Sequence, residues 1–545
     1  MSFDPVECRA QFPLFSATEN AGLIYLDNAA TTPMPSSVIE AISQYSSTDH
    51  ANVHRASHRL ARRATEHLEA TRAKTAAFIH ARTDEIVFTR GATEGLNLLV
   101  SVLSETWSRG DELIVGPAEH HANLLPWLRV AQMRGLTLRF LPLQADGYPE
   151  IDALSTLLTA RTRVVAISAA SNVLGYTLDV SRVAAYVRNS SALLIVDAAQ
   201  AVAHERLDVT AMGCDFLVFS AHKVYGPTGL GVLYGRRECL ACLPPWQLGG
   251  EMVRSVSETA MTFADPPHRF EAGTLPLGAI VGWSATVDFL ARSDRSAWRV
   301  HERALAVQLM QELASIPALR LLSTRVNNLG VVTYALDASH NGCYGNGCYG
   351  DGRYGDVADL GLWLDQHDIA VRVGYHCAQP LYQRLVAAQG LRLSLAAYNT
   401  FADIERTIDV IRKWFEGALF YQKPLYQKPL YQKPSYQKRS HQPECSSVYD
   451  VVDDLDVNAL RAKQDWQSRY RMLMAWGNVI QPKPALRALA TQRVAGCEAE
   501  TWLAVTLDQG RYWFSLDSSS RLVRGLGALM LLWFQGHTAE EIAAV

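Results

Sequence analysis

The sequence predicts an α/β protein whose largest domain is a mostly parallel sheet covered by helices on both faces. Between residues 21 and 284, short apolar runs alternate with amphipathic stretches, which is typical of consecutive βαβ units. The length of 545 residues exceeds one average domain and favours several. In sheets of this kind the chemistry gathers at the carboxyl ends of the strands, so we expect the functional residues there.

The predicted strands of the large domain are residues 85–88, 112–116, 137–143, 164–168, 192–197 and 216–220, with helical patterns between most of them, for example 96–108 and 181–189. A smaller α+β domain is expected over residues 285–417. It opens with a long helix, continues through strands at 330–335 and 369–373, and closes with a helix from about Thr400. Residues 1–20 are expected to pack with this small domain.

Two repeats interrupt the second half of the chain. A glycine-rich pentapeptide repeat at 341–355 contains Cys343 and Cys348 and predicts a flexible surface insertion. A Tyr-Gln-Lys-Pro unit recurs every five residues from Tyr421 and decays by Glu444, which predicts an extended linker at 418–452, because regular proline forbids helix. Roughly 36 residues at about 3.1 Å each reach on the order of 100 Å when fully extended. Residues 453–545 are then a separate module.

Composition points to a cytoplasmic globular protein. The net charge of −3 gives no reason to expect nucleic acid or an acidic membrane as a partner. The N-terminus lacks a signal-peptide pattern, and the longest apolar run, 526–534, is too short to span a bilayer. Nine cysteines do not make a disulfide scaffold. The C-x-x-C pair Cys239 and Cys242 has no second pair for a metal, so no metal site is predicted, and we interpret the two as buried thiols.

Lys223 is the first candidate for chemistry. It follows an apolar strand and precedes three glycines within eight positions, so its amine should be partly desolvated and able to form a Schiff base. Ser220 and His222 can donate to a phosphate, and the glycines allow close approach of a bulky cofactor. Taken alone, Lys223 is equally well interpreted as an exposed lysine in a turn.

Neighbouring motifs add to the case for a cofactor. Asp197 ends an apolar strand, where a carboxylate can hold a pyridine nitrogen protonated, and Gln200 can reach a ring hydroxyl. Thr93 lies where a helix opens after a strand, which is an anion site. His120 lies in a strand-to-helix loop and can stack on a flat cofactor. Each residue alone has a structural interpretation, but the set in this order is hard to assign to chance.

The motifs together resemble a group II cysteine desulfurase, the SufS/CsdA type of class V, fold-type I enzymes that use pyridoxal 5′-phosphate (PLP). They are Gly-Ala-Thr-Glu-Gly, Glu-His-His-Ala-Asn, Ser-Asn-Val-Leu-Gly, Val-Asp-Ala-Ala-Gln, Ser-Ala-His-Lys and Arg-Val-Gly-Tyr-His-Cys-Ala-Gln-Pro. The similarity runs from about residue 20 to 416 and is interrupted by the glycine-rich insertion. It implies a large PLP-binding domain at 21–284 and a small domain at 285–417.

The resemblance implies a role for each candidate. Lys223 would form the Schiff base with PLP, Asp197 would bind the ring nitrogen and Gln200 the ring oxygen, and His120 would stack on the ring. Asn172, Arg392 and Arg372 would bind the substrate, L-cysteine, with Asn172 also near the cofactor. The phosphate would be bound by Thr93, Ser220, His222 and, from the other subunit of a homodimer, Thr274.

Cys377 is the predicted nucleophile. It follows a strand, and Arg372 and His376 are expected to favour its thiolate. The resemblance implies that Lys223 removes the α-proton of cysteine, that Cys377 attacks the substrate sulfur to give a persulfide, and that alanine is released. The alternative is an inert buried thiol.

The C-terminal module resembles the SufE/CsdE sulfur-acceptor family through Asp465-Trp-Gln-Ser-Arg-Tyr-Arg, Ala495-Gly-Cys-Glu-Ala-Glu-Thr-Trp and Val523-Arg-Gly-Leu-Gly-Ala. The resemblance makes Cys497 the receiving thiol, in a loop before a strand. Ala495 and Ala499 depart from the family's usual residues, and the match stops short of its C-terminal helices. The alternative is a degenerate docking remnant.

Other functions remain open at this point. A selenocysteine lyase would use the same site, a scaffold protein could retain the fold without turnover, and a class V aminotransferase would need no cysteine at position 377. The final sulfur acceptor, whether an iron–sulfur scaffold, a thiocofactor or tRNA, does not follow from the sequence.

Overall fold

The computed structural model describes residues 3–54, 57–145, 147–323, 329–336, 357–387, 389–420, 455–456, 459–460, 472–473, 476–477, 480, 483–487, 492–494, 500–518 and 520–543. The chain forms two compact units. The first comprises Met1–Ala314, Leu321–Ala335 and Asp368–Arg406, and the second comprises Ser315–Arg320, Leu336–His367 and Thr407–Val545. Both 341–355 and the repeat at 418–452 lie outside the described residues, except for the end of one helix at 418–420.

The first unit is built on a seven-stranded sheet of order β2-β8-β7-β6-β5-β3-β4. Strands β7, β6, β5, β3 and β4 run parallel, whereas β8 is antiparallel to both of its neighbours. The strands are β2 (Ile86–Thr89), β3 (Glu112–Val115), β4 (Thr137–Phe140), β5 (Thr162–Ser168), β6 (Leu193–Asp197), β7 (Phe216–Ser220) and β8 (Gly231–Gly235).

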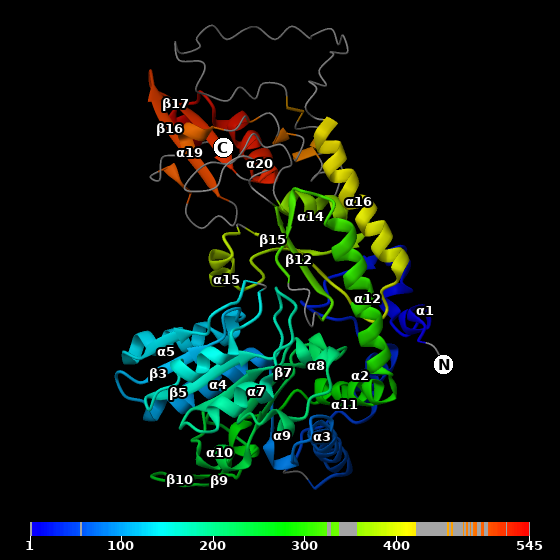
Figure 1. Cartoon of the computed structure of the whole chain (residues 1–545), viewed down its shortest axis with the longest axis vertical. Coiled ribbons are helices and arrows are strands. Elements are labelled where there is room, and N and C mark those ends of the chain that lie inside the picture. Colours follow the sequence, from blue (N-terminus) through cyan, green and yellow to red (C-terminus); the bar gives the residue numbers. More distant parts are fainter. Residues whose placement is uncertain are drawn as a thin grey trace. The chain divides into compact units, whose positions relative to one another are not determined.

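Helices cover both faces of this sheet (Figure 1). Because successive side chains of a strand point to opposite faces, Val164 and Ala166 of β5 join one core while Val165 and Ile167 join the other. The first core includes residues of α4 (Ala92–Leu103) and α5 (Leu125–Arg134). The second includes residues of α3 (Arg59–Phe78), α7 (Val180–Val187) and α11 (Leu277–Arg292). The predicted mostly parallel, doubly covered sheet is confirmed.

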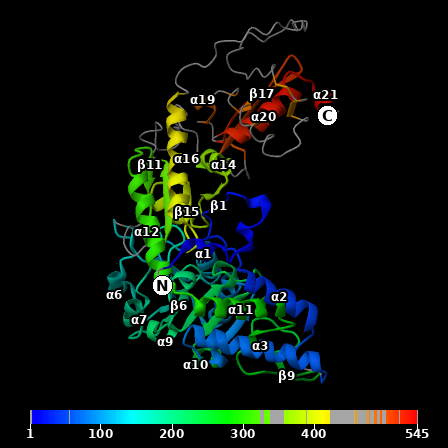
Figure 2. The same cartoon turned by 90° about the vertical axis from the view of Figure 1, so that its right-hand side faces the viewer.

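On the second face, α11 packs against α2 (Ser36–Thr48) and α3 (Figure 2). Gly282 of α11 lies so close to Ile42 of α2 that an added Cβ would come within 2.7 Å of it. The other elements of the large sheet's surroundings are η3 (Thr83–Glu85), η4 (Ser104–Thr106), η5 (His121–Asn123), η6 (Ile151–Ala153), α6 (Leu154–Leu157), α8 (Ala201–His204), α9 (Val209–Met212), η7 (Ala221–Lys223), α10 (Arg237–Cys242), β9 (Val253–Val256), β10 (Met261–Phe263) and η8 (His268–Phe270).

The rest of the first unit is a smaller α+β part. Strand β15 (Gly390–Ser394) pairs antiparallel with β12 (Val331–Leu336) and β14 (Arg372–Gly374). Strand β1 (Ile24–Tyr25) pairs parallel with β13 (Ile369–Ala370). This part also contains α12 (Arg295–Leu313), α15 (Gln379–Arg384), α1 (Pro5–Arg9), η1 (Pro13–Phe15), η2 (Thr18–Asn20) and the start of α16 (Phe401–Phe420).

The N-terminal segment is anchored by ring packing. Phe12 is fully buried, and its ring centroid lies 5.0 Å from that of Tyr398 and 5.6 Å from that of Tyr225. Nη1 of Arg9 lies 3.4 Å from a carboxylate oxygen of Asp403. The segment therefore contacts residues from both the early and the late parts of the unit.

Two sequence predictions differ from the structure, and one strand was not predicted. The predicted strand at 369–373 is two short strands, β13 and β14, which belong to different sheets. The predicted long helix after residue 285 is the end of α11 followed by α12, because Asp294 caps a new helix through the amide of Ala297. Strand β8 was not predicted, since its glycine-bounded sequence lacks the usual alternation.

The second unit contains α14 (Val357–Asp365) and the end of α16, where Nε1 of Trp363 donates to the carbonyl of Val410 at 3.0 Å. Strand β11 (Leu319–Leu321) lies at the boundary of the two units in the chain. Near the C-terminus, β16 (Thr501–Asp508) and β17 (Arg511–Ser518) form an antiparallel hairpin. Further helices are α19 (Pro484–Arg487), α20 (Arg521–Phe534) and α21 (Ala539–Ala543).

The hairpin and α20 share a small core with Leu473, Trp476 and Ile480. The guanidinium of Arg487 donates two hydrogen bonds, of 2.6 and 2.8 Å, to the buried carboxylate of Asp517. Gly525 permits α20 to approach Leu473, because an added Cβ would overlap the carbonyl oxygen of that residue. Among the described helices of the whole chain, none is long and apolar enough to cross a bilayer.

Candidate active site

Lys223 ends the short helix η7, directly after β7. The carboxylate of Asp197, the guanidinium groups of Arg392 and Arg372, and the thiol of Cys377 all lie close enough to act on it electrostatically. Burial lowers the pKa of the Lys223 amine, and Asp197 opposes this effect only in part. Residues that are far apart in the sequence thus surround one amine that loses its proton more readily than a solvated lysine.

Asp197 is the last residue of β6, as predicted. Its side chain is buried, and one carboxylate oxygen accepts a 2.9 Å hydrogen bond from the amide of Ala199. Burial raises the pKa of this carboxyl group, while the Ala199 hydrogen bond and the charge of Lys223 lower it in part. Gln200, at the following turn, donates to the carbonyl of Ala29 at 2.8 Å.

The N-terminus of α4 lies beside the end of β7. Gly91 is the N-cap, and Oγ of Ser220 accepts a 2.8 Å hydrogen bond from the amide of Ala92. An added Cβ on Gly231 would lie 2.4 Å from Cα of Gly91, so only glycine permits this approach of β8 to the helix. Thr93 is exposed in the first turn, and the helix N-terminus with its free amides can bind an anion.

His120 and His222 are both neutral at physiological pH. Burial and the charge of Lys223 lower the pKa of His120 to about 3 and that of His222 to about 4. Nδ1 of His120 accepts a 3.1 Å hydrogen bond from the amide of Ala122, which leaves the ring proton on Nε2. His222 is held by Thr31 and Thr32, whose hydroxyls both donate to its carbonyl at 3.1 Å.

Arg392 is buried and lies in a network that begins at the other end of the chain. Its Nη2 donates to Asp27 at 3.2 Å and its Nη1 to the carbonyl of Asn172 at 3.1 Å. Its Nε is buried with no hydrogen-bond partner among the described residues. Asp27 also accepts two hydrogen bonds from Nε of Arg372 and one of 2.8 Å from its Nη2. The three predicted substrate residues therefore lie together, with one buried donor still to be satisfied.

Cys377 follows β14 in a tight loop and is exposed. His376 and Cys377 both adopt the left-handed region, with φ of 49° and 54°. The loop is held in this form because the carbonyl of Cys377 accepts a 2.7 Å hydrogen bond from the amide of His121, and the carbonyl of His376 accepts one of 2.8 Å from Asn172. Cys377 is thereby tied to the loop that carries His120.

His376 does not supply the positive charge that we expected to favour the Cys377 thiolate. Burial and the charge of Arg392 lower the pKa of its imidazole to about 3, so the ring is neutral. Its Nδ1 lies 2.6 Å from the hydroxyl of Tyr382 and its Nε2 lies 3.3 Å from the carbonyl of Arg372. The residue holds the loop, and the nearby positive charge comes from Arg372.

The other described cysteines differ in setting. Burial raises the pKa of both Cys8 and Cys214 to about 12. Cys239 is partly buried and Cys242 is exposed on α10, so the interpretation of this pair as two buried thiols is wrong. Cys377 differs from Cys242 because it alone of these exposed thiols lies near Lys223. Cys343, Cys348 and Cys497 lie outside the described residues.

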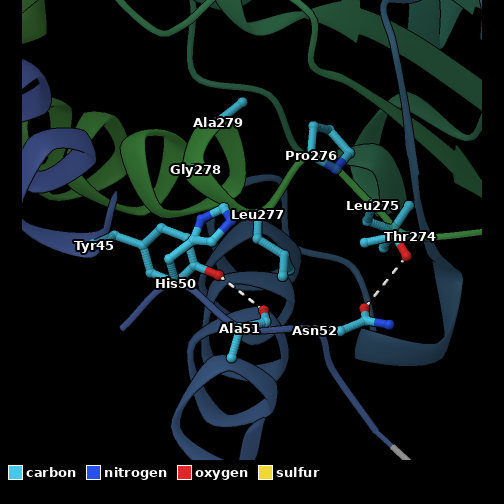
Figure 3. Close-up of a pocket in the computed structure, with 10 residues that line it drawn as sticks. All are labelled: Tyr45, His50, Ala51, Asn52, Thr274, Leu275, Pro276, Leu277, Gly278 and Ala279. Atoms are coloured by element: carbon cyan, nitrogen blue, oxygen red, sulfur yellow. Dashed lines mark hydrogen bonds between the residues drawn. The ribbon is translucent and has the colours of Figure 1, made fainter. Parts of the chain in front are cut away.

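Thr274 lies elsewhere, on the wall of a 520 Å³ cavity (Figure 3). Its hydroxyl donates to the side chain of Asn52 at 3.3 Å, and His50 and Tyr45 line the same cavity. The lining contains no member of the Lys223 group. Within one chain, the structure does not bring Thr274 to the site that holds the other predicted phosphate residues.

Asp27 and Glu119 are site residues that we did not predict. Asp27 joins Arg372 and Arg392, and its sequence signal is its place at the end of the apolar run Ile24–Leu26. Glu119 precedes His120 and accepts hydrogen bonds from the Ser168 amide (2.8 Å), the Ser168 hydroxyl (2.6 Å) and Asn123 (2.6 Å). Burial raises the pKa of this carboxyl group to about 7.

Lys223 follows β7 and is desolvated, and the buried carboxylate of Asp197 ends the neighbouring strand β6. In a doubly wound sheet, this pair defines a PLP enzyme of fold type I. The residues present fit this cofactor. The amine of Lys223 suits a Schiff base, and Asp197 suits a pyridinium nitrogen. The N-terminus of α4 with Ser220 beside it suits a phosphate.

Known proteins give the same answer. Residues 24–407 match the family "Aminotransferase class-V", and residues 456–545 match SufE, the "Fe-S metabolism associated domain". A cysteine desulfurase of Dickeya dadantii is 41% identical over 404 residues, which are 73% of this chain and 94% of the relative.

Solved structures share the fold. The crystal structure of the cysteine desulfurase CsdA (S-sulfonic acid) from Escherichia coli matches with a TM-score of 0.68 and 36% identity, over 76% of this chain and 99% of that one. C-DES, a mutant with glycine covalently linked to its PLP cofactor, matches at a TM-score of 0.61 over 74% and 98% of the two chains. Its identity of 21% supports the fold alone. The chain belongs to the class V aminotransferase family as a PLP-dependent cysteine desulfurase with a SufE domain.

Proposed function

We propose that this enzyme moves sulfur from L-cysteine first to Cys377 and then to Cys497 of its own SufE domain, for iron–sulfur cluster or thiocofactor assembly. The observation that carries the first step is the placement of Cys377. It is exposed in a strained loop, tied through His121 to the His120 loop, and lies near Lys223. A nucleophile and a base therefore converge on one site.

The buried polar groups supply substrate binding. Nε of Arg392 lacks a partner among the described residues, and a substrate carboxylate would satisfy it. Asn172 donates to the carbonyl of His376, and Arg372 donates to Asp27. Both side chains therefore lie beside Arg392. We assign the α-carboxylate of L-cysteine to Arg392 and Asn172, with Arg372 beside it.

The cofactor residues follow from the same geometry. Lys223 would hold PLP, Asp197 its ring nitrogen, Gln200 its ring oxygen and His120 one face of the ring. Ser220, His222 and Thr93 would bind the phosphate. When bound, PLP withdraws electrons and so stabilises negative charge beside the amino group of the substrate.

The chain's own residues then carry protons and sulfur. The low-pKa amine of Lys223 removes the α-proton of cysteine. The Cys377 thiolate attacks the substrate sulfur, so that an S–S bond forms as the Cβ–S bond breaks. The electron pair of the broken bond stays on Cβ, which takes up a proton, and Lys223 returns the α-proton to Cα to give alanine. The step needs no external oxidant or reductant.

In the second step the Cys497 thiolate attacks the outer sulfur of the Cys377 persulfide, and Cys377 leaves as a thiolate. Cys497 lies outside the described residues, but the chain on either side of it is held together. The amide of Val494 donates to the carbonyl of Thr501 at 2.8 Å, and the backbones of Arg493 and Trp502 form an isolated antiparallel β-bridge. Residues 495–499 therefore connect two hydrogen-bonded chain segments, which supports an acceptor loop before β16.

The shared phosphate site is also a proposal. Thr274 lies on a cavity apart from the Lys223 group of its own chain, and we propose that it reaches the phosphate of a second subunit in a homodimer. Sedimentation measurements and complementation between Lys223→Ala and Thr274→Ala chains test this. Mixed dimers that regain activity are expected, and a fully active monomer would contradict it.

Mass spectrometry after a cysteine pulse tests the sulfur path. We expect the mass of one sulfur atom on Cys377 first and on Cys497 later. Cys377→Ser should remove both signals, whereas Cys497→Ser should keep the first. Cys242→Ser is the matched control, because Cys242 is also exposed but is not among the groups that act electrostatically on Lys223. Sulfur on Cys497 in the Cys377→Ser variant would overturn the proposed order.

A further inference from the structure

Three side chains outside the Lys223 site converge, and the proposed reaction gives none of them a role. One potential ligand atom from each of His54, Glu69 and His268 lies within 4.8 Å of the other two. They come from different segments: His54 precedes α3, Glu69 lies in its middle, and His268 opens η8. Two imidazoles and a carboxylate are the ligand set of many zinc sites.

The carboxylate of Glu69 has an unused oxygen. Its Oε2 accepts a 3.3 Å hydrogen bond from Nε of Arg72, but its Oε1 is buried with no hydrogen-bond partner among the described residues. A buried carboxylate oxygen without a partner is costly. A cation bound between Glu69 and the two imidazoles would satisfy it.

The surrounding charges favour a cation. Glu69 and Glu271 are two carboxylates beside the single guanidinium of Arg72, and Nδ1 of His268 lies 4.0 Å from Oε2 of Glu271. The carboxylate of Glu271 is already hydrogen-bonded and is not counted as a metal ligand, because it accepts two hydrogen bonds from Arg72 and one of 2.7 Å from the amide of Phe88. It therefore contributes negative charge to the cluster, and the three ligands remain His54, Glu69 and His268.

The ligand-bearing segments are already held near their binding positions. The amide of His54 donates to Oγ1 of Thr65 at 2.9 Å, and Thr65 lies one turn before Glu69 on α3. The rings of His54 and His268 meet edge to face, with centroids 5.6 Å apart. Ligands at about 2.0–2.2 Å from a tetrahedral zinc ion lie roughly 3.4 Å apart, so side-chain movements of about an ångström are enough.

We propose that His54, Glu69 and His268 form a zinc site that ties α3 to the segment leading into Glu271 and Thr274. The ion would take three protein ligands and one water. His268 lies six residues before Thr274, and Glu271 with its buried ion pair lies between them. The bound metal would therefore hold the start of the segment 268–274 against α3.

Zinc binding to the holoenzyme tests the proposal. Thiols are first blocked with iodoacetamide, because cysteine also binds zinc, and metal is removed with a chelator. Elemental analysis after gel filtration and calorimetric titration with zinc chloride should then give one zinc ion per chain. Loss of an outer-shell partner already costs about 10–100-fold in metal affinity, so His268→Gln and Glu69→Gln should each weaken binding at least about tenfold.

Matched controls come from the same helix. Glu66→Gln and His67→Gln change exposed or partly exposed residues of α3 outside the cluster and should leave zinc binding unchanged. Zinc should also raise the melting temperature of the wild type and of these controls, but not of His268→Gln. Equal zinc affinity in the wild type and in His268→Gln, or no bound zinc in the wild type, would overturn the proposal. Neither result depends on desulfurase activity.

Discussion

Lys223 shows how one residue acquires its chemistry from its surroundings. Burial lowers the pKa of its amine more than Asp197 raises it, and the positive charges of Arg392 and Arg372 act in the same direction as burial. The amine therefore becomes a better base and nucleophile at neutral pH than a solvated lysine. The lysine itself was predictable from its strand and glycines, whereas the arginine pair that acts on it comes from residues more than 140 positions away.

Replacing Lys223 by alanine should remove both the cofactor attachment and the base. Turnover of L-cysteine to alanine should fall at least about 100-fold, the lower end of what a positioned base supplies. The yellow absorption of the purified protein should decrease with it. Lys74→Ala is the control, because Lys74 is partly exposed and pairs with Asp288 at the surface. Near-normal turnover in Lys223→Ala would show that another group is the base.

Glu119 provides a pH prediction. Its pKa rises from 4.5 to about 7 on folding because of burial. The folded protein therefore keeps this proton to higher pH than the unfolded chain, so the group costs stability increasingly as the pH rises from 4.5 to 7, by about 3 kcal/mol in total. Infrared spectroscopy should detect a protonated carboxyl band that titrates near pH 7 and is absent from Glu119→Gln.

The same variant tests the stability effect. Relative to the wild type, Glu119→Gln should gain stability as the pH is raised from 4.5 to 7, measured by urea unfolding at a series of pH values. Glu66→Gln, an exposed change in α3, should show no such trend. A carboxyl band that titrates near pH 4.5 would contradict the prediction.

At the scale of elements, the strands that end at site residues were the most predictable. β7 has the predicted bounds, and β6 ends at the predicted Asp197, because long apolar runs leave few alternatives. Residues 369–373 read as one strand, but the chain there changes sheets between β13 and β14. β13 pairs with β1, more than 300 residues away, whereas β14 pairs with β15. A pairing as distant as that of β13 with β1 is not encoded in a local pattern.

The same limit applies to the site residues. Lys223, Asp197 and Cys377 lie next to predicted strands, so the sequence could single them out as candidates. Asp27 was missed because its place in the site depends on its ion pair with Arg372, 345 positions away. The error about His376 has the same origin, since burial of its ring and its contact with Tyr382 set its charge.

The buried pair of Arg72 and Glu271 joins α3, β2 and the segment before α11. Arg72 also donates to the carbonyl of Ile86, and both side chains are almost fully buried. Arg72→Met should destabilise the protein by about 3–5 kcal/mol, because it leaves the Glu271 carboxylate buried without its partner. Urea unfolding followed by tryptophan fluorescence measures the change.

Two further variants isolate the cause. Lys74→Met removes a partly exposed pair on the same helix and should cost less than about 1 kcal/mol. Arg72→Met combined with Glu271→Gln should recover part of the loss, since no buried charge then lacks a partner. If the double variant is less stable than Arg72→Met alone, the unpaired charge is not the reason.

At the scale of the whole molecule, a cysteine desulfurase and a SufE domain share one chain. The proline-containing repeat at 418–452 lies between them in the sequence. A linker of the kind that the repeat predicts would give the proposed acceptor Cys497 a concentration on the order of millimolar at Cys377. Donor and acceptor at ordinary protein concentrations would meet far less often, so the fusion should change the kinetic order of sulfur transfer.

Turnover without added thiol reductant should therefore be independent of dilution. Alanine formation per wild-type chain should stay constant over about a 100-fold range of protein concentration, because the effective concentration set by the tether does not change. Cys497→Ser, and truncation after Phe420, the last residue of α16, should both lower this rate sharply, and a thiol reductant should restore it. A wild-type rate per chain that falls in proportion to dilution would show that Cys377 passes its sulfur to other molecules.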